Sequence, residues 1–285
     1  MRKFIISMMI LFSAGMVSFI PCKVHAADWG IGIYTFYARW EPSFKDIFEN
    51  LEYDKNHLYG GPAFSVTFFE NWTLGTLICF EISETNMEYD YQGTGEISGT
   101  DYNLHVKSNP NRIDWDNTLT YKINQQFKVF IGYKVNNIVI HKEVPFGEDK
   151  PITISSPYTL STYFEWQKER IINFGPALGI NYTIPLSYNT AIIFSTSGLY
   201  TTTKLSILEY YEFSSNVIEA RLKEYHYYGV GNNSTITLSY FIEPLSTVIS
   251  VGGRFQVFKY IAESDSPDLS NDYFYGITAS AMYFF

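Results

Sequence analysis

The chain has 285 residues, of which 18% are aromatic and only 17% are charged. Its 29 acidic residues outnumber its 20 basic ones, so the formal charge is −9. Because nucleic-acid phosphates require clusters of Lys and Arg, this balance excludes a nucleic-acid partner. Small solutes, sugars, cations and protein partners stay open.

The first 26 residues have the pattern of a secretory signal peptide. Arg2 and Lys3 form a positive start, and residues 4–20 are uncharged and mostly apolar. Val24-His25-Ala26 then places a β-branched residue at −3 and Ala at −1, so we expect cleavage after Ala26. An uncleaved membrane anchor is the alternative, but the run is short for a span of about 20 apolar residues. We therefore predict a signal peptide over 1–26 and one domain over 27–285.

Removal of the signal leaves a more acidic chain with a single cysteine. The signal holds three basic residues and no acidic one, so residues 27–285 carry 17 basic and 29 acidic residues, a formal charge of −12. Cys22 leaves with the signal unless it is lipidated, which the bulky residues before it disfavour. Cys79 alone cannot form an intramolecular disulfide or a Cys-based metal site, and we expect no metal and no cofactor.

Strands rather than helices are predicted for this domain. No segment after the signal has about 18 consecutive apolar residues, so no transmembrane helix is expected. Residues 113–123 alternate between two faces, with Asn117 as the one exception. This alternation fits a membrane-spanning barrel with a polar lumen, whereas a soluble sandwich needs a dry inner face. One face carries Ile113, Trp115, Leu119, Tyr121 and Ile123, and the other carries Asp114, Asp116, Thr118, Thr120 and Lys122.

Short turns alternate with long polar connections along the chain. This is the usual asymmetry between periplasmic turns and extracellular loops, and it requires a closed ring because backbone groups in lipid must be paired internally. An even strand count places both termini on the periplasmic side. Eight or twelve strands stay open, because a hairpin hidden in a long connection would change the count by two. Taken in chain order, the predicted strands cover about 30–40, 58–69, 72–83, 113–123, 127–138, 168–184, 190–203, 232–242, 247–260 and 273–285.

One long connection, 204–231, contains a predicted short helix. Ser215 and Asn216 are suited to cap it. Apolar residues align partly on one face over 217–224, so we expect a helix that folds over the barrel mouth.

The last predicted strand has an apolar residue at every second position and ends on Phe. It resembles the C-terminal β-signal of bacterial outer-membrane proteins. The resemblance implies an integral outer-membrane barrel that contacts lipid and is inserted by the barrel assembly machinery through its C-terminal strand. Ala279 and Ala281 depart from the pattern because they are small for lipid-facing positions. The residues that carry the resemblance are Ile277, Ala279, Ala281, Tyr283 and Phe285.

Aromatic residues gather near the predicted strand ends. Such residues form girdles at the two membrane interfaces of outer-membrane barrels. An aromatic core inside the protein is the alternative. The predicted girdle residues are Trp29, Trp40, Tyr59, Trp72, Phe127, Tyr188, Tyr273 and Phe285.

Seven charged residues are predicted to face the lumen. Ten strands enclose a narrow interior, between the filled eight-stranded barrels and the aqueous channels of sixteen-stranded porins. The charges therefore form either a polar plug or the lining of a path for small solutes. They are Glu81, Asp114, Asp116, Lys122, Lys128, Lys134 and Arg254.

An enzyme at the extracellular rim is an alternative function. The strand count is similar to that of the omptins, outer-membrane proteases with paired acids and an Asp-His pair at the rim, and lipid-modifying barrels are a second class. Four histidines, His57, His105, His141 and His226, lie in or beside the predicted loops. No omptin motif matches residue by residue and no G-x-S-x-G motif occurs, so no catalytic residue is assigned.

We therefore predict an all-β, ten-stranded antiparallel transmembrane barrel over residues 27–285, porin-like in architecture and located in the bacterial outer membrane. The expected function is non-enzymatic, with long acidic surface loops and a lumen that is closed or narrowly permeable to small solutes. Extracellular ligands at the loops stay open. A rim enzyme and a soluble secreted β-protein are the alternatives.

Overall fold

The computed structural model describes residues 28–46, 49–83, 86–94, 101–143, 168–214, 217–263 and 266–285. The predicted signal peptide, 1–26, lies outside these residues. The described chain forms one antiparallel sheet and two short 3-10 helices, η1 (Ser43–Asp46) and η2 (Glu243–Leu245). No helix in these ranges is long and apolar enough to span a bilayer.

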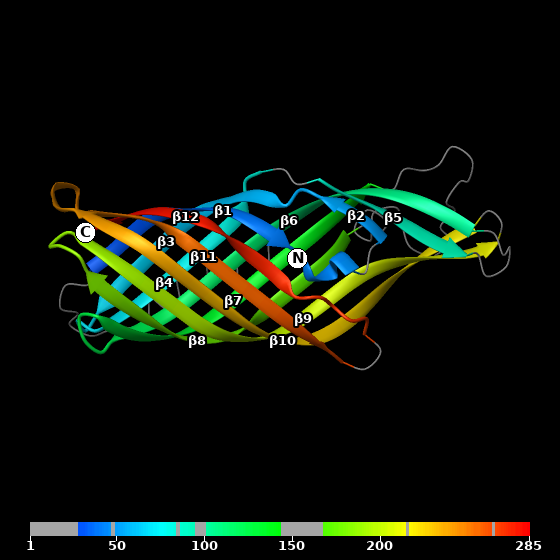
Figure 1. Ribbon diagram of the computed structural model, residues 1–285. Helices are drawn as coiled ribbons and strands as arrows, with labels where there is room; N and C mark the ends of the chain where they lie inside the picture. The colour runs from blue at the N-terminus through cyan, green and yellow to red at the C-terminus, as the bar shows by residue number, and fades with distance from the viewer. Residues whose placement is uncertain are drawn as a thin grey trace.

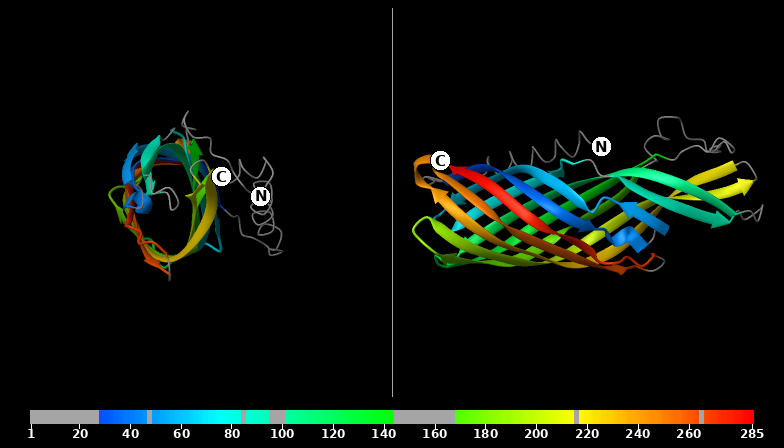
Figure 2. Two further views of the ribbon diagram at one scale, coloured as in Figure 1. Left: turned by 90° about the vertical axis from the view of Figure 1, so that its right-hand side faces the viewer. Right: turned by 45° about the horizontal axis from the view of Figure 1, so that its top comes forward.

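Ten strands close into a barrel (Figure 1). They follow the order β6-β4-β3-β1-β12-β11-β10-β9-β8-β7, and β6 pairs with β7 to complete the ring. The left-hand view in Figure 2, which looks along the barrel axis, shows the strands arranged in this ring. The prediction of an antiparallel ten-stranded barrel is confirmed. The ring strands are β1 (Asp28–Glu41), β3 (Asn56–Phe68), β4 (Trp72–Glu81), β6 (Asp101–Lys122), β7 (Phe127–Glu143), β8 (Lys168–Pro185), β9 (Thr190–Ser214), β10 (Val217–Ile242), β11 (Thr247–Ala262) and β12 (Asp272–Phe284).

Two further strands extend the sheet outside the ring. β5 (Met87–Thr94) pairs with the first part of β6, and β2 (Glu49–Tyr53) pairs with β5. The hairpin of β5 and β6 occupies most of the connection between the predicted strands 72–83 and 113–123. The long connections therefore contain paired strands, which is why β6 begins twelve residues before the position predicted from the alternation.

The prediction of a short helix over 217–224 is wrong. Val217 begins β10, and this segment pairs with the end of β9. β9 and β10 are 25 and 26 residues long. Pairing gives each backbone group of the segment a partner on the neighbouring strand, whereas an isolated eight-residue helix is marginal in water.

The four short connections 69–71, 123–126, 186–189 and 243–246 meet at one end of the barrel, which we call the turn end; the opposite end is the loop end. Neighbouring turns are linked there, because the Lys122 amide donates to the Asn71 carbonyl at 2.8 Å and the Phe241 amide donates to the Asn189 carbonyl at 2.8 Å. The ring is sealed at this end by the amide of Phe285, which donates to the Trp29 carbonyl at 2.9 Å.

The outer wall of the barrel is a belt of exposed apolar side chains. On β1, Ile31, Ile33 and Tyr37 point outward, while Phe36 and Ala38 are buried in the lumen. A soluble protein would bury side chains of this size, and their continuous exposure around a closed barrel is the pattern of a lipid-facing surface.

The girdle prediction is wrong for two of its eight residues. Trp40 and Tyr59 are 0% and 2% exposed and point into the lumen. Both lie in register with inward residues such as Phe36, so the strand's own alternation places them inside. By contrast, Trp29, Trp72, Tyr188 and Phe285 are exposed at the turn end.

Candidate functional site

The lumen is divided along its axis into two halves of different composition. β7 runs from the turn end to the loop end, and the composition of its inward-facing residues changes along the way. The half nearer the turn end, which we call the turn half, holds many small and polar residues beside rings such as Phe130. The loop half holds mainly apolar residues, with a few buried polar ones such as Asn173 and Thr201. In order, the inward-facing residues of β7 are Lys128, Phe130, Gly132, Lys134, Asn136, Ile138 and Ile140.

The loop half is filled by a buried apolar cluster. Phe274 lies at its centre, with ring centroids 4.7 Å from Phe36 and 5.0 Å from Tyr59, both edge-on. Edge-to-face rings at such distances attract beyond their buried area. The cluster contains Phe36, Ala38, Trp40, Tyr59, Met87, Ile138, Ile140, Ile171, Leu199, Leu205, Tyr225, Tyr227, Phe258, Tyr260 and Phe274.

A chain of ion pairs crosses the lumen beneath this cluster. Asp114 accepts from the Arg112 Nε at 3.1 Å and lies 3.5 Å from the Lys134 Nζ. Lys134 also donates to Asp116 at 2.6 Å. Asn136 donates a further short hydrogen bond to Asp114. The carboxylates and cations alternate, so each buried charge has an opposite charge beside it, as burial in a low-dielectric interior requires.

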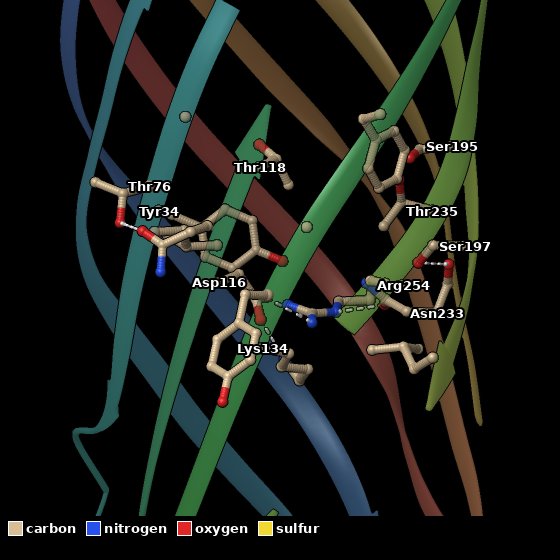
Figure 3. Close-up of a pocket in the computed structure, with 18 of the residues that line it drawn as sticks. Tyr34, Thr76, Asp116, Thr118, Lys134, Ser195, Ser197, Asn233, Thr235 and Arg254 are labelled. Atoms are coloured by element: carbon tan, nitrogen blue, oxygen red, sulfur yellow. Dashed lines mark hydrogen bonds and ion pairs between the residues drawn. The ribbon is translucent and has the colours of Figure 1, made fainter. Parts of the chain in front are cut away.

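Arg254 joins this chain of charges to the far wall. Its guanidinium donates to Asp116 at 3.3 Å, to the Asn233 side chain at 3.0 Å and to the Gln256 side chain at 3.1 Å. Figure 3 shows Arg254 and Lys134 converging on Asp116 from different strands. The charged network, defined as Arg112, Asp114, Asp116, Lys134 and Arg254, therefore ties β6 and β7 to β11.

Two further buried polar pairs lie above the network, near the loop end. The His57 Nδ1 is 2.8 Å from a Glu81 oxygen, and the two side chains are 0% and 2% exposed. The Trp40 Nε1 donates to Asp272 at 3.0 Å. The Arg112 guanidinium lies 3.9 Å from the Phe274 ring centroid, so a cation-π contact connects the network to the apolar cluster.

A cavity of about 310 Å³ lies on the turn side of the network. Asp116, Lys134 and Arg254 form one boundary. The rest of the wall combines small or polar residues with apolar side chains. Thr118, Ser195, Ser197, Asn233 and Thr235 lie around the cavity beside the ring of Tyr34 (Figure 3). Gly132 and Ala177 complete the small residues, and the apolar side chains include Leu77, Phe130 and Leu199.

The structure brings together five of the seven charged residues singled out from the sequence. Asp114, Asp116, Lys134 and Arg254 form the network, and Glu81 lies next to it, accepting from the Arg112 amide at 3.3 Å. Lys122 and Lys128 stand apart. They pair in register with each other near the turn end of β6 and β7, where both are partly exposed.

The five residues of the proposed assembly signal lie on the outer wall of β12 and at its end. Ile277 is 63% exposed, and Tyr283 and Phe285 are also exposed; Ala279 is exposed and Ala281 half-buried. β12 pairs with β1 on one side and with β11 on the other, and these pairings close the barrel.

Sequence reasoning missed Arg112, the most buried cation of the network. It shares the inward register of Asp114, two residues away, and this parity was the available signal. The predicted strand began at Ile113, so Arg112 was assigned to a loop. Asp272 was missed for the same reason, and His57 was assigned to a loop rather than to the lumen, since each lies just outside a predicted strand boundary.

No family model and no curated protein sequence matches the chain. Among solved structures it is similar to the outer membrane protease OmpT from Escherichia coli, at 10% identity over 94% of this chain and 99% of that chain, with a TM-score of 0.46. It is also similar to the toluene transporter TodX from P. putida, at 10% identity over 94% and 91% of the two chains and a TM-score of 0.34. LpxR from Salmonella typhimurium matches at 10% identity over 90% and 100% of the chains, with a TM-score of 0.27. The fold assignment rests on the strand pairing of this chain itself, which gives a closed β-barrel of the outer-membrane type.

Proposed function

We propose that this protein is a non-enzymatic integral outer-membrane barrel whose lumen is closed between its two ends. The observation that carries the proposal is the charged network beneath the apolar cluster. Together they form two successive barriers on the axis, one made mainly of apolar side chains and one in which each charge is already paired. A hydrated ion that crosses the first barrier loses its water, and none of the apolar side chains replaces that hydration.

The short turns favour an orientation with the turn end in the periplasm and the loop end outside the cell. Both ends of the described chain, Asp28 and Phe285, lie at the turn end, so this orientation places them on the periplasmic side. The outward residues of β12 then face lipid, and the barrel assembly machinery is the partner expected for this strand. The acidic residues concentrated in the long connections are available to extracellular ligands.

A rim enzyme is less well supported than a closed barrel. The His57–Glu81 pair is the one described histidine–carboxylate contact, and it lies under Trp40 with almost no exposed surface. A general base must reach the proton that it abstracts, and this pair has no route to a substrate. Within the described residues there is also no group of three or more His, Cys, Asp or Glu side chains suited to a metal ion.

Conductance of the refolded protein in a planar bilayer tests the proposal. Heat-modifiable gel migration first establishes that the barrel is folded. We expect no steady openings from the wild type. Steady, reproducible openings would contradict the closed lumen and would make Asp116, Lys134 and Arg254 candidates for selectivity.

Two matched double variants test whether the apolar cluster is the reason that the wild type passes no current. Trp40→Ala combined with Phe274→Ala removes two large side chains from the apolar cluster, and one of them is the ring that packs on Arg112 of the charged network. This double variant should weaken both barriers and produce openings or current noise. Ile33→Ala combined with Ile277→Ala removes apolar side chains of similar exposure, 64% and 63%, from the outer wall and should remain silent. If the two double variants behave alike, the apolar cluster is not the barrier.

A further inference from the structure

The turn half of the lumen differs from the loop half in exposure as well as in composition. Inward residues of the loop half, such as Ala38 and Thr201, are buried. Inward residues of the turn half, such as Thr118, Thr120 and Thr235, are partly exposed. Solvent therefore reaches the lumen from the turn end and stops at the charged network.

The cavity is held open by the sizes of the residues around it. On β6, β7 and β8, the inward positions in register are Thr118, Gly132 and Ala177, so three neighbouring strands present only small side chains or none. Phe130 lies flat against the wall over Gly179, where a Cβ atom would come within 2.3 Å of its Cζ. The small residues of the sequence therefore leave an open space between this wall and Arg254. Its volume lies at the lower end of the roughly 300–1,000 Å³ of ligand pockets.

Hydroxyl and amide groups in the cavity are left without protein partners. The hydroxyls of Thr118, Ser195 and Thr235 form no hydrogen bond with any other described residue. Asn233 accepts from Arg254 through its Oδ1, so its amide nitrogen keeps its two donors. These groups both donate and accept, and the Tyr34 ring adds an apolar face beside them.

The charges at the cavity boundary are already paired. Asp116 accepts from Lys134 and from Arg254, and Arg254 also donates to Asn233 and Gln256 and is hydrogen-bonded to Tyr34. An anionic ligand would compete with Asp116 for Arg254 and Lys134, and separating a buried ion pair is strongly unfavourable. A neutral ligand keeps them intact and uses the free hydroxyl and amide groups.

We propose that the turn half of the lumen is a binding cavity for a small neutral polyhydroxylated solute, of the size of a mono- or disaccharide, which enters from the turn end. Its hydroxyl groups bond to Thr118, Ser195, Thr235 and Asn233, and a ring face packs on Tyr34. The orientation given above makes this a periplasmic site, but binding itself does not depend on that orientation.

Calorimetric titration of the refolded full-length barrel with D-glucose, maltose and inorganic phosphate tests the class of ligand. We expect heat of binding with at least one sugar and none with phosphate. Thr235→Val replaces a cavity hydroxyl by a methyl group of the same shape and should weaken sugar binding roughly two- to twelvefold, the range for one neutral hydrogen bond. Thr201→Val makes the same change in the buried loop half and should leave binding unchanged.

Labelling of an introduced thiol tests the location independently. In a Cys79→Ser background, Thr118→Cys should react with a water-soluble maleimide, and the bound sugar should slow the reaction. Phosphate binding without sugar binding would overturn the neutral ligand, because Lys122 and Lys128 would then be attracting anions toward the cavity. A folded barrel that binds neither sugar has only a water-filled cavity, and equal effects of Thr235→Val and Thr201→Val would place the site elsewhere.

Discussion

The two halves of the lumen are built by the same strands, yet one is packed like a protein core and the other contains a solvent-accessible cavity. Along β7, Gly132 borders the cavity, Lys134 belongs to the charged network, and Ile138 and Ile140 belong to the apolar cluster. Six positions in the sequence, from Gly132 to Ile138, therefore take the strand from the cavity to the apolar cluster. The alternation of a barrel strand determines only which side chains face inward. The size and polarity of those inward residues decide whether the lumen is filled or open, and each level of the barrel is set separately.

The largest effect should come from the charged network, which separates the halves. Asp114→Ala leaves Arg112 and Lys134 without this partner and should lower the free energy of unfolding by about 4–5 kcal/mol, the upper part of the range for breaking a buried ion pair. Urea unfolding of the refolded barrel measures it. Asp114→Asn keeps the shape and one acceptor and should cost less. A loss below about 1 kcal/mol for Asp114→Ala would show that the network does not stabilise the barrel.

Truncating a ring in each half compares their packing directly. Phe258 is 1% exposed within the apolar cluster, so Phe258→Ala should cost about 3 kcal/mol. Phe284 faces the turn half and is partly exposed, and Phe284→Ala should cost clearly less because its site leaves no closed void. Equal losses in urea unfolding would remove the distinction between a packed half and an open half.

Loss of a hydrogen bond should also destabilise the loop half more than the turn half, but the difference in unfolding free energy should be smaller than for the rings. Trp40→Phe removes the donor to the buried Asp272 carboxylate and should cost about 2 kcal/mol, since that oxygen is left without this donor. Ser250→Ala removes the 2.8 Å hydrogen bond with Ser239 in the turn half and should cost about 1 kcal/mol, because Ser239 is buried but the position of Ser250 is partly exposed to water. A larger loss for Ser250→Ala would mean that water does not enter the turn half.

The smallest effect is expected outside the lumen. Lys204 and Glu224 form a 2.7 Å ion pair on the outer face of β9 and β10, with both side chains substantially exposed. Lys204→Ala should change the free energy of unfolding by less than about 1 kcal/mol, and added salt should reduce even that. An effect as large as that of Asp114→Ala would mean that the outer face, and not the lumen, determines stability.

The closed ring could be predicted because lipid imposes alternation on every strand, and segments such as 113–123 display it without ambiguity. The strand ends could not be predicted, since beyond the apolar belt both faces become polar and alternation disappears. β10 therefore was not traced back to Val217, and Arg112 was not assigned to β6.

The charged residues of the site could be assigned to the lumen, but their grouping could not. Asp116 and Arg254 are 138 residues apart, and they meet only because the barrel closes. Trp40 was misplaced because an aromatic residue at a strand end suits a girdle as well as a lumen. The alternation of inward and outward residues counted from Phe36 resolves that choice. The cavity depends on the positions of Gly132, Ala177 and Thr235 along the barrel axis, and these relative positions cannot be derived from any single strand.

The seam between β1 and β12 has a consequence for the order of events during assembly. Thr35 and Ala279 meet across it, 244 residues apart, whereas β1 finds its other neighbour, β3, within the next hairpin. Contacts of such long range form slowly, because a long loop must first be closed. One edge of β1 is therefore exposed until the last strand of the chain is in place, and an uncovered edge is a template for mispairing. The time taken to form this one seam, and not the speed of the individual hairpins, sets how long the incomplete barrel is at risk of aggregation.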